Sequence, residues 1–165
     1  MRKSSIYLLA LFLCFCFGGC QPSGISGNDF LLQQQSYYQN LQAICSSSDD
    51  ILTLYLIGSM DITDFQNEFH LLDKQIRLSM NQYKQEKAQI TPGSHSYASK
   101  AGMEALNQAG DEILNFLHTV LQNPSDKEFV AQQYILFQEN IVEQLAVYIT
   151  AKEMIIIENK EASHE

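Results

Sequence analysis

The feature that most constrains this fold is a stripe of apolar residues between residues 61 and 89. Apolar side chains recur there three or four positions apart, which places them on one face of an α-helix. Asp61 offers a side-chain oxygen that suits a helix N-cap, and Asp64 adds negative charge to the first turn. The pattern predicts one long helix whose buried face is formed by Ile62, Phe65, Phe69, Leu72, Ile76, Met80 and Tyr83.

Two further long helices are predicted, separated by breaks that contain proline. After Thr91-Pro92-Gly93, either Ser94 or Ser96 can cap a helix that ends at Asn123-Pro124. The next four residues, 125–128, have the S-x-x-E form of a capping box and predict the start of the last helix at Ser125. Small residues four positions apart allow a neighbour to approach the first of these two helices closely: Ala101, Ala105 and Ala109.

The segment before Gly58 predicts two shorter helices. The first runs from Asp29 to about Cys45, and the serines at 46–48 are expected to end it and to cap the second. The second helix covers the nearly continuous apolar run at 51–57, for which a strand is the alternative because the run is short.

These elements predict an all-α fold, an elongated antiparallel helical bundle. Short breaks between long helices make sequential neighbours antiparallel. A four-helix-like bundle, with the N-terminal helices as the fourth layer, is the preferred arrangement, and a three-helix hairpin with a loosely packed N-terminal segment is the alternative. The bundle domain is expected at 30–158, after a short flexible tether at 20–29 that is rich in Pro, Gly and Ser, and before a polar tail at 159–165.

The first twenty residues have the pattern of a secretion signal. Arg2 and Lys3 form a basic start, and the apolar run from Ile6 to Phe17 is too short to span a bilayer as a stable helix. Two small residues, Gly18-Gly19, then lead to Cys20. The pattern predicts that residues 1–19 are a signal peptide and are absent from the mature protein.

The stretch Phe17-Gly18-Gly19-Cys20 resembles the lipobox of bacterial lipoproteins, with Phe17 where that family usually has Leu, Val or Ile. The resemblance covers residues 1–20 and implies that Cys20 becomes a lipidated N-terminus that carries diacylglycerol and a further fatty acid such as palmitate. Two or three acyl chains would hold the protein on the extracytoplasmic side of a cell membrane or outer membrane. An ordinary signal peptide cleaved nearby is the alternative.

The net charge restricts the kinds of partner the protein can bind, and the cysteine content restricts its possible disulfides. Without Arg2 and Lys3, eight basic residues face nineteen acidic ones, and the formal net charge is −11. This balance argues against nucleic acid and against a polybasic membrane patch. Cys45 is the only cysteine after Cys20, so no disulfide framework exists and Cys45 is either a buried thiol or an intermolecular crosslink.

Residues that could carry catalysis or bind a metal form no cluster that the spacing supports. A di-metal bundle would show Glu-x-x-His on two helices, and this chain has that spacing once, near its C-terminus. No cofactor, metal site or catalytic residue is therefore predicted. The candidates considered are Glu161 with His164, His70 with Asp73, the polar line of Glu104, Asp111 and His118, and His95 between two serines.

Amides are almost as frequent as charged residues on the polar surface that the pattern predicts. The chain has 17 Gln and 9 Asn, against 29 charged residues, and the amides gather beside two tyrosines near residue 35. Amides and tyrosine rings can hydrogen-bond and stack against a partner without opposite charge. Gln33, Gln34, Tyr37 and Tyr38 are therefore a possible contact face, although the preferred interpretation is a solvent-exposed polar face whose tyrosines anchor the helix to the core.

The function predicted first is that of a lipid-anchored lipoprotein of the cell envelope that acts as a non-enzymatic helical protein-interaction module. Its partners would be the membrane, through the lipid, and an envelope protein. The alternative is a lipoprotein that binds a small molecule or glycan in a pocket between helices. An enzyme ranks third, because no converging polar groups are visible in the sequence.

Overall fold

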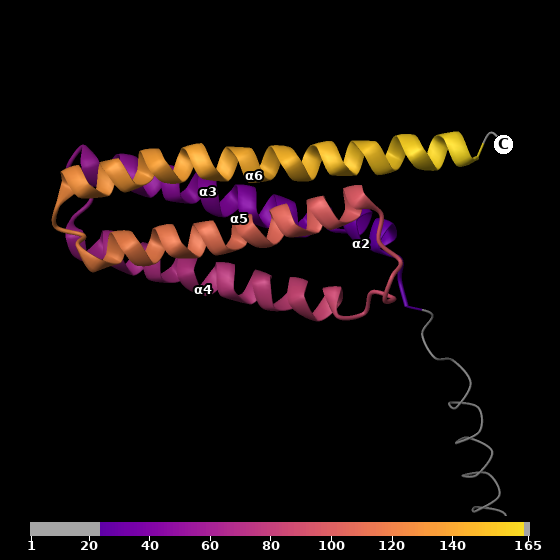
Figure 1. Cartoon of the computed structure of the whole chain (residues 1–165). Helices are drawn as coiled ribbons and strands as arrows, with labels where there is room; N and C mark the ends of the chain where they lie inside the picture. Colours follow the sequence, from indigo (N-terminus) through magenta and orange to yellow (C-terminus); the bar gives the residue numbers. More distant parts are fainter. Residues whose placement is uncertain (1–23, 164–165) are drawn as a thin grey trace, which may run out of the picture.

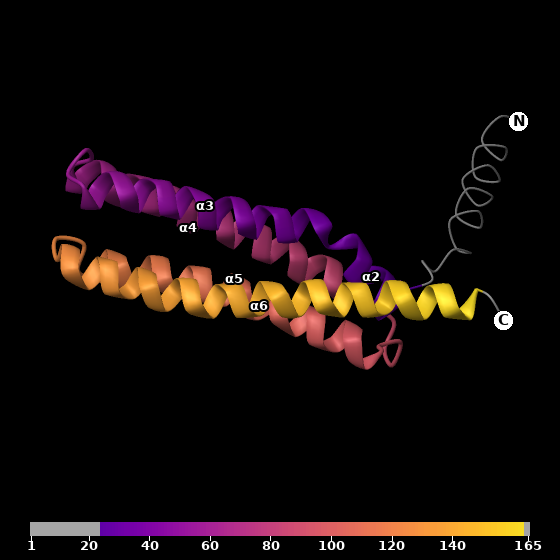
Figure 2. The same cartoon turned by 90° about the horizontal axis from the view of Figure 1, so that it is seen from above.

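The computed structural model describes residues 24–163 and shows an all-α bundle, which confirms the predicted fold class. Its long helices run side by side along one axis and alternate in direction (Figures 1 and 2). As expected, the N-terminal part of the chain supplies the fourth long helix of the bundle, α3. The described residues form five helices: α2 (Gly27–Gln33), α3 (Gln35–Leu56), α4 (Ile62–Lys87), α5 (Tyr97–Gln122) and α6 (Lys127–Ala162).

Aromatic side chains tie the four long helices together along the core. Phe65 on α4 stacks on Tyr55 of α3, with ring centroids 4.1 Å apart. Farther along, Phe69 of α4 meets Phe116 of α5 at 6.0 Å, and Phe116 stacks on Phe137 of α6 at 4.3 Å. All five rings are buried, so one apolar core runs through the bundle.

Of the predicted N-caps of the three long helices, two are confirmed. The side chain of Asp61 accepts hydrogen bonds from the backbone N–H groups of Thr63 and Asp64, and that of Ser96 accepts one from Ser99. The predicted cap at Ser125 is wrong, because α6 begins one residue later and the Asp126 carboxylate accepts from the Phe129 N–H at 3.0 Å. A carboxylate is favoured at this position by the positive end of the helix dipole.

The predicted helix end at the serines 46–48 is also wrong, since α3 continues through them. The hydroxyl of Ser48 donates to the carbonyl of Ile44, 2.9 Å away and one turn earlier, so it is satisfied inside the helix. Ser48 is fully buried between Ile44 and Leu52 on the core-facing side. Burial of this face outweighs the tendency of serine to end helices, and the alternative of a strand at 51–57 is excluded.

The real interruption lies at Gln34, between α2 and α3. Its backbone N–H turns back to the carbonyl of Leu31 at 3.2 Å, and its side-chain amide donates to Glu86 of α4 at 3.2 Å. The bend lets α2 pack onto α5, where fully buried Leu31 lies against Gly102. No glycine or proline marks this break in the sequence.

Residues 24–29 are fixed to the connection between α4 and α5. The Thr91 N–H donates to the carbonyl of Ile25 at 3.0 Å, and the Gly27 N–H donates to the carbonyl of Ser94 at 3.1 Å. The bundle domain therefore begins before the predicted boundary at residue 30, and it ends later as well, because α6 continues to Ala162. Cys20 and the first residues of the expected tether lie outside the described residues.

Both ends of the described chain lie at one end of the bundle. The C-terminal end of α6 is found there together with α2 and the α4–α5 connection (Figures 1 and 2). The turns that join α3 to α4 and α5 to α6 lie at the opposite end. No helix between residues 24 and 163 has the length and hydropathy that a membrane span requires.

Candidate functional site

Three of the four residues predicted as a contact face are buried. Gln33 is exposed, whereas Gln34, Tyr37 and Tyr38 are only 3 %, 5 % and 9 % exposed. The Tyr37 ring stacks on Tyr83 of α4 at 4.5 Å, and the Tyr38 ring lies 4.9 Å from that of Tyr148 on α6. The possible contact face is therefore wrong for both tyrosines, and the preferred interpretation holds, because they join α3 to its neighbours in the core.

Helical spacing explains this placement. Tyr37, Leu41 and Ile44 recur at intervals of four and three, so they share the core-facing side of α3. Burial and the nearby Asp111 carboxylate raise the pKa of Tyr37 well above its ordinary value. Gln34 and Tyr37 do line a cavity between α3 and α4, but its volume of about 20 Å³ is close to that of one water molecule and cannot hold a sugar.

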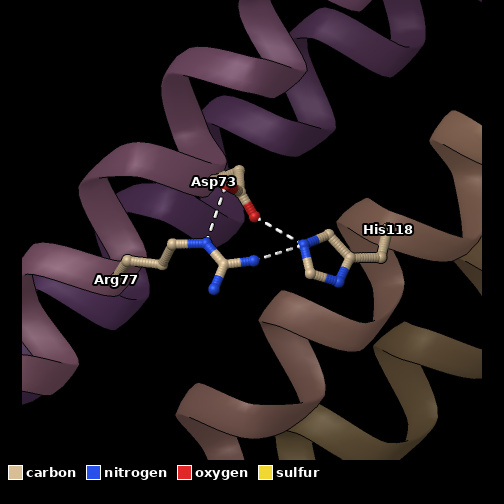
Figure 3. A network of polar contacts seen from close by, with 3 residues as sticks. All are labelled: Asp73, Arg77 and His118. Atoms are coloured by element: carbon tan, nitrogen blue, oxygen red, sulfur yellow. Dashed lines mark hydrogen bonds and ion pairs between the residues drawn. The ribbon is translucent and has the colours of Figure 1, made fainter.

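The one group of interacting charged side chains among residues 24–163 lies between α4 and α5 (Figure 3). Asp73 accepts from the Arg77 Nε at 2.9 Å, one turn later on α4. Its second oxygen lies 2.7 Å from the Nε2 of His118 on α5, and the same nitrogen lies 2.7 Å from an Arg77 terminal nitrogen. The sequence suggested His70 as a neighbour of Asp73, but the contact is made by His118 across the helix boundary.

The His118 Nε2 cannot serve both neighbours at once. A ring nitrogen that carries a proton can donate to Asp73, and one that carries a lone pair can accept from Arg77. Partial burial raises the pKa of Asp73, but the hydrogen bonds from Arg77 and His118 and their positive charge lower it more, so the pKa lies below its ordinary value. The group is a polar link between α4 and α5 at the surface.

The chemistry open to this link is limited by what surrounds it. A shallow groove of about 320 Å³ beside it is lined by His70, Asp73, His118, Leu121 and Gln122, none of which is a hydroxyl or thiol nucleophile. No three His, Cys, Asp or Glu side chains within residues 24–163 are arranged to hold a metal ion. The arrangement holds two helices together more readily than it activates a nucleophile.

Cys45 is a partly buried residue of α3 next to the core. Its side chain packs against the apolar core, and burial raises the pKa of the thiol to about 12. A thiol with so high a pKa is almost entirely protonated at neutral pH and reacts slowly. This placement favours the buried thiol over the intermolecular crosslink.

The most unusual surface of the molecule is the side of α6 that faces away from the bundle, here called the outer face of α6. Four β-branched residues recur on it every seven positions, which aligns them along the helix. Neighbouring exposed residues widen this stripe. The outer face comprises eight side chains that are 36–61 % exposed: Ile135, Leu136, Val142, Val147, Ile149, Met154, Ile156 and Ile157.

The outer face exists because α6 is apolar on more than one side. Phe137, Ile141 and Tyr148 fill its core-facing side, and the contacts of α6 are mainly with α5. A helix in contact with one layer of a bundle ordinarily has apolar residues on one side and polar residues on the opposite side. In the described residues nothing covers the outer side of this helix of 36 residues.

A groove between α5 and α6, here called the α5–α6 groove, borders the outer face. Its apolar part, about 400 Å³, is lined mainly by small and aliphatic residues from both helices and by Tyr97, which is 87 % exposed. Its polar part, about 270 Å³, contains Asp111 and Glu112, and Asn140 donates to Glu112 across it at 2.9 Å. The apolar part is lined by Tyr97, Ala98, Ala101, Glu143, Ala146, Val147, Thr150, Ala151 and Met154.

Comparisons with known proteins give no relative. No protein-family model matches the chain, and neither a curated protein nor a solved structure was found to be similar to it. Function is therefore inferred from the geometry of the described residues.

Proposed function

We propose that this protein is a lipid-anchored lipoprotein of the cell envelope and a non-enzymatic interaction module that binds a protein partner through the outer face of α6. The observation that carries the proposal is the row of exposed β-branched residues along that helix. Exposed Glu139 and Glu153 interrupt the row, but large apolar side chains gathered on one face often mark a protein contact. Complete burial of an exposed aliphatic side chain contributes about 1.5 to 3 kcal/mol, and these side chains are about half exposed, so a partner that covers several of them gains roughly half of that for each.

The anchor in this proposal is Cys20, after removal of residues 1–19. Gly24 is four positions after Cys20, a reach of at most about 14 Å. The end of the bundle that carries α2 would then lie next to the membrane, on its extracytoplasmic side. Since the outer face spans Ile135 to Ile157 and an α-helix rises about 1.5 Å per residue, it would extend about 33 Å along the bundle.

The alternative, a lipoprotein that binds a small molecule, has one observation in its favour. The apolar part of the α5–α6 groove could take a small apolar ligand, because alanine and aliphatic side chains line most of it. A glycan is less well matched, since Gln34, Tyr37 and Tyr38 are buried and only Gln33 of the four predicted contact residues is exposed. We prefer the protein partner because the exposed apolar surface extends far beyond the groove.

Photo-crosslinking in intact cells tests the proposal. A photoreactive amino acid at Val142 or Ile149 is expected to form an adduct with one envelope protein, whereas the same residue at Leu78, an exposed leucine on α4, should not. Native mass spectrometry of the purified protein provides the contrary outcome. A retained small molecule, together with no protein adduct at either position on α6, would show that the protein is a ligand carrier instead.

A further inference from the structure

We propose that the α5–α6 groove is the docking site for a basic amphipathic helix of the partner, with a large apolar side chain in the apolar part and a lysine or arginine in the polar part. This inference rests on the proposed function and specifies the chemistry of the partner. A groove between two antiparallel helices is a common binding site for a third helix, whose apolar face packs into the groove.

The apolar part fits an anchoring side chain. Ala98 and Ala101 on α5 face Val147 and Met154 on α6 across about 400 Å³, so the small residues leave room that a partner can fill. Tyr97 lines the apolar part and is almost fully exposed to solvent. Exposed tyrosines beside apolar hollows are characteristic of the centres of protein interfaces.

The polar part supplies the charge that the partner must complement. Asp111 and Glu112 line it, Glu143 lines the apolar part, and no lysine or arginine lines either part. The ion pairs found among residues 24–163 all involve Asp73, so these three carboxylates have no cation of their own. A basic residue of the partner would therefore meet uncompensated negative charge.

The distance between the apolar and polar parts of the groove determines how far apart the anchoring side chain and the basic side chain must be on the partner helix. Ala101 and Gln108 mark the apolar and polar parts on α5 and are seven residues apart, which is about 10 Å along a helix. A docked helix would thus carry its anchor and its basic residue about seven positions apart. A second copy of this chain is a poor occupant, because its formal net charge is −9 even with the basic signal included.

Crosslinking with mapping of the captured segment tests the inference in the full-length protein in cells. Benzoylphenylalanine replaces Tyr97 at the apolar part and Gln108 at the polar part, and Ile149 serves as a reference position on the outer face. Both groove positions are expected to give adducts with one partner segment that contains lysine or arginine within about two helical turns of the crosslinked residue. A captured segment that is acidic or neutral, or that belongs to a second copy of this chain, would overturn the inference.

Charge reversal adds a quantitative readout. Glu143→Lys should lower the Tyr97-position adduct at least fivefold, whereas the matched change Glu68→Lys, at an exposed site on α4, should alter it less than twofold. Equal effects of the two changes would overturn the inference. Adducts at Ile149 without any in the groove would also overturn it while leaving the proposed function intact, and no adduct at any of the three positions would refute both.

Discussion

At the scale of single residues, two glycines inside α5 explain how tightly the bundle can pack. A glycine in the middle of a helix costs about 0.5 to 1 kcal/mol relative to alanine, so it needs a packing reason. A methyl group added at Gly102 would lie 2.5 Å from Leu31 of α2 and 2.9 Å from Ala151 of α6. One added at Gly110 would lie 2.6 Å from the Tyr37 hydroxyl. Both glycines are therefore points where three helices meet.

Gly102→Ala is expected to destabilise the protein by about 1 to 3 kcal/mol, because the added methyl overfills the contact between α5, α2 and α6. Helix propensity alone gives the opposite sign, a gain of about 1 kcal/mol. Urea unfolding monitored by circular dichroism measures the difference. A more stable variant would mean that α2 does not pack onto α5 as described.

Two buried tyrosines provide a second test at this scale. The Tyr83 hydroxyl donates to the carbonyl of Met103 at 2.9 Å, whereas the buried Tyr148 hydroxyl has no partner among residues 24–163. Tyr83→Phe should therefore cost about 1 kcal/mol of unfolding free energy, and Tyr148→Phe should leave it unchanged or raise it. Equal losses in urea unfolding would contradict this difference.

At the scale of helices, the sequence was a good guide where apolar spacing and capping residues agree. Phe69 and Tyr83 lie on the buried face that their spacing predicts, and Asp61 caps α4 as expected. The break at Gln34 carries no local signal, because it arises from the packing of α2 onto α5. Serine favours helix ends as an average tendency, and the buried position of Ser48 overrode it.

The contacts between side chains on different helices could not be predicted from the sequence. His118 and Asp73 are 45 residues apart, and their contact depends on how α4 and α5 are rotated about their axes. The burial of Tyr37 and Tyr38 was different, since their spacing with Leu41 already indicated the core. The neighbouring amides suggested a contact face that includes the two tyrosines, but helical periodicity places the tyrosines on the buried side of α3.

The link between α4 and α5 predicts a pH dependence. Because the pKa of Asp73 is lowered in the folded protein, its contribution to stability is present above pH about 4 and is lost as the pH falls through the lowered value. Asp73→Asn should be less stable than the wild type at pH 6, by less than about 1 kcal/mol, because such surface pairs are weak.

Urea unfolding of both proteins between pH 2 and pH 6 measures this effect. The gap between wild type and variant should close at the acidic end, while Arg77 stays charged throughout. A gap that widens towards low pH would contradict the assignment of the link to the ionised Asp73 carboxylate.

At the scale of the whole molecule, the bundle architecture followed from three long apolar stripes and the breaks between them. The outer face of α6 was harder to foresee, because periodicity does not tell which apolar side of a helix other helices leave uncovered. The anchor is a separate matter, since it depends on residues 1–20 and on processing in the cell.

Lipidation at Cys20 is tested by the intact mass of protein extracted from membranes. The expected product lacks residues 1–19 and carries a diacylglyceryl adduct, and Cys20→Ser should release or misprocess the protein while the bundle still folds. A soluble product cleaved at another bond would show that the signal is of the ordinary secreted kind.

The most direct test of the central claim compares two pairs of exposed residues that are each seven positions apart. Val142→Asp with Ile149→Asp changes the outer face of α6, and Leu71→Asp with Leu78→Asp makes the same kind of change on α4. Both double variants should remain helical by circular dichroism, and recovery of the crosslinked envelope partner should fall at least tenfold for the α6 pair alone. Equal recovery from both variants, or a loss confined to the α4 pair, would contradict the claim that this protein binds its partner through α6.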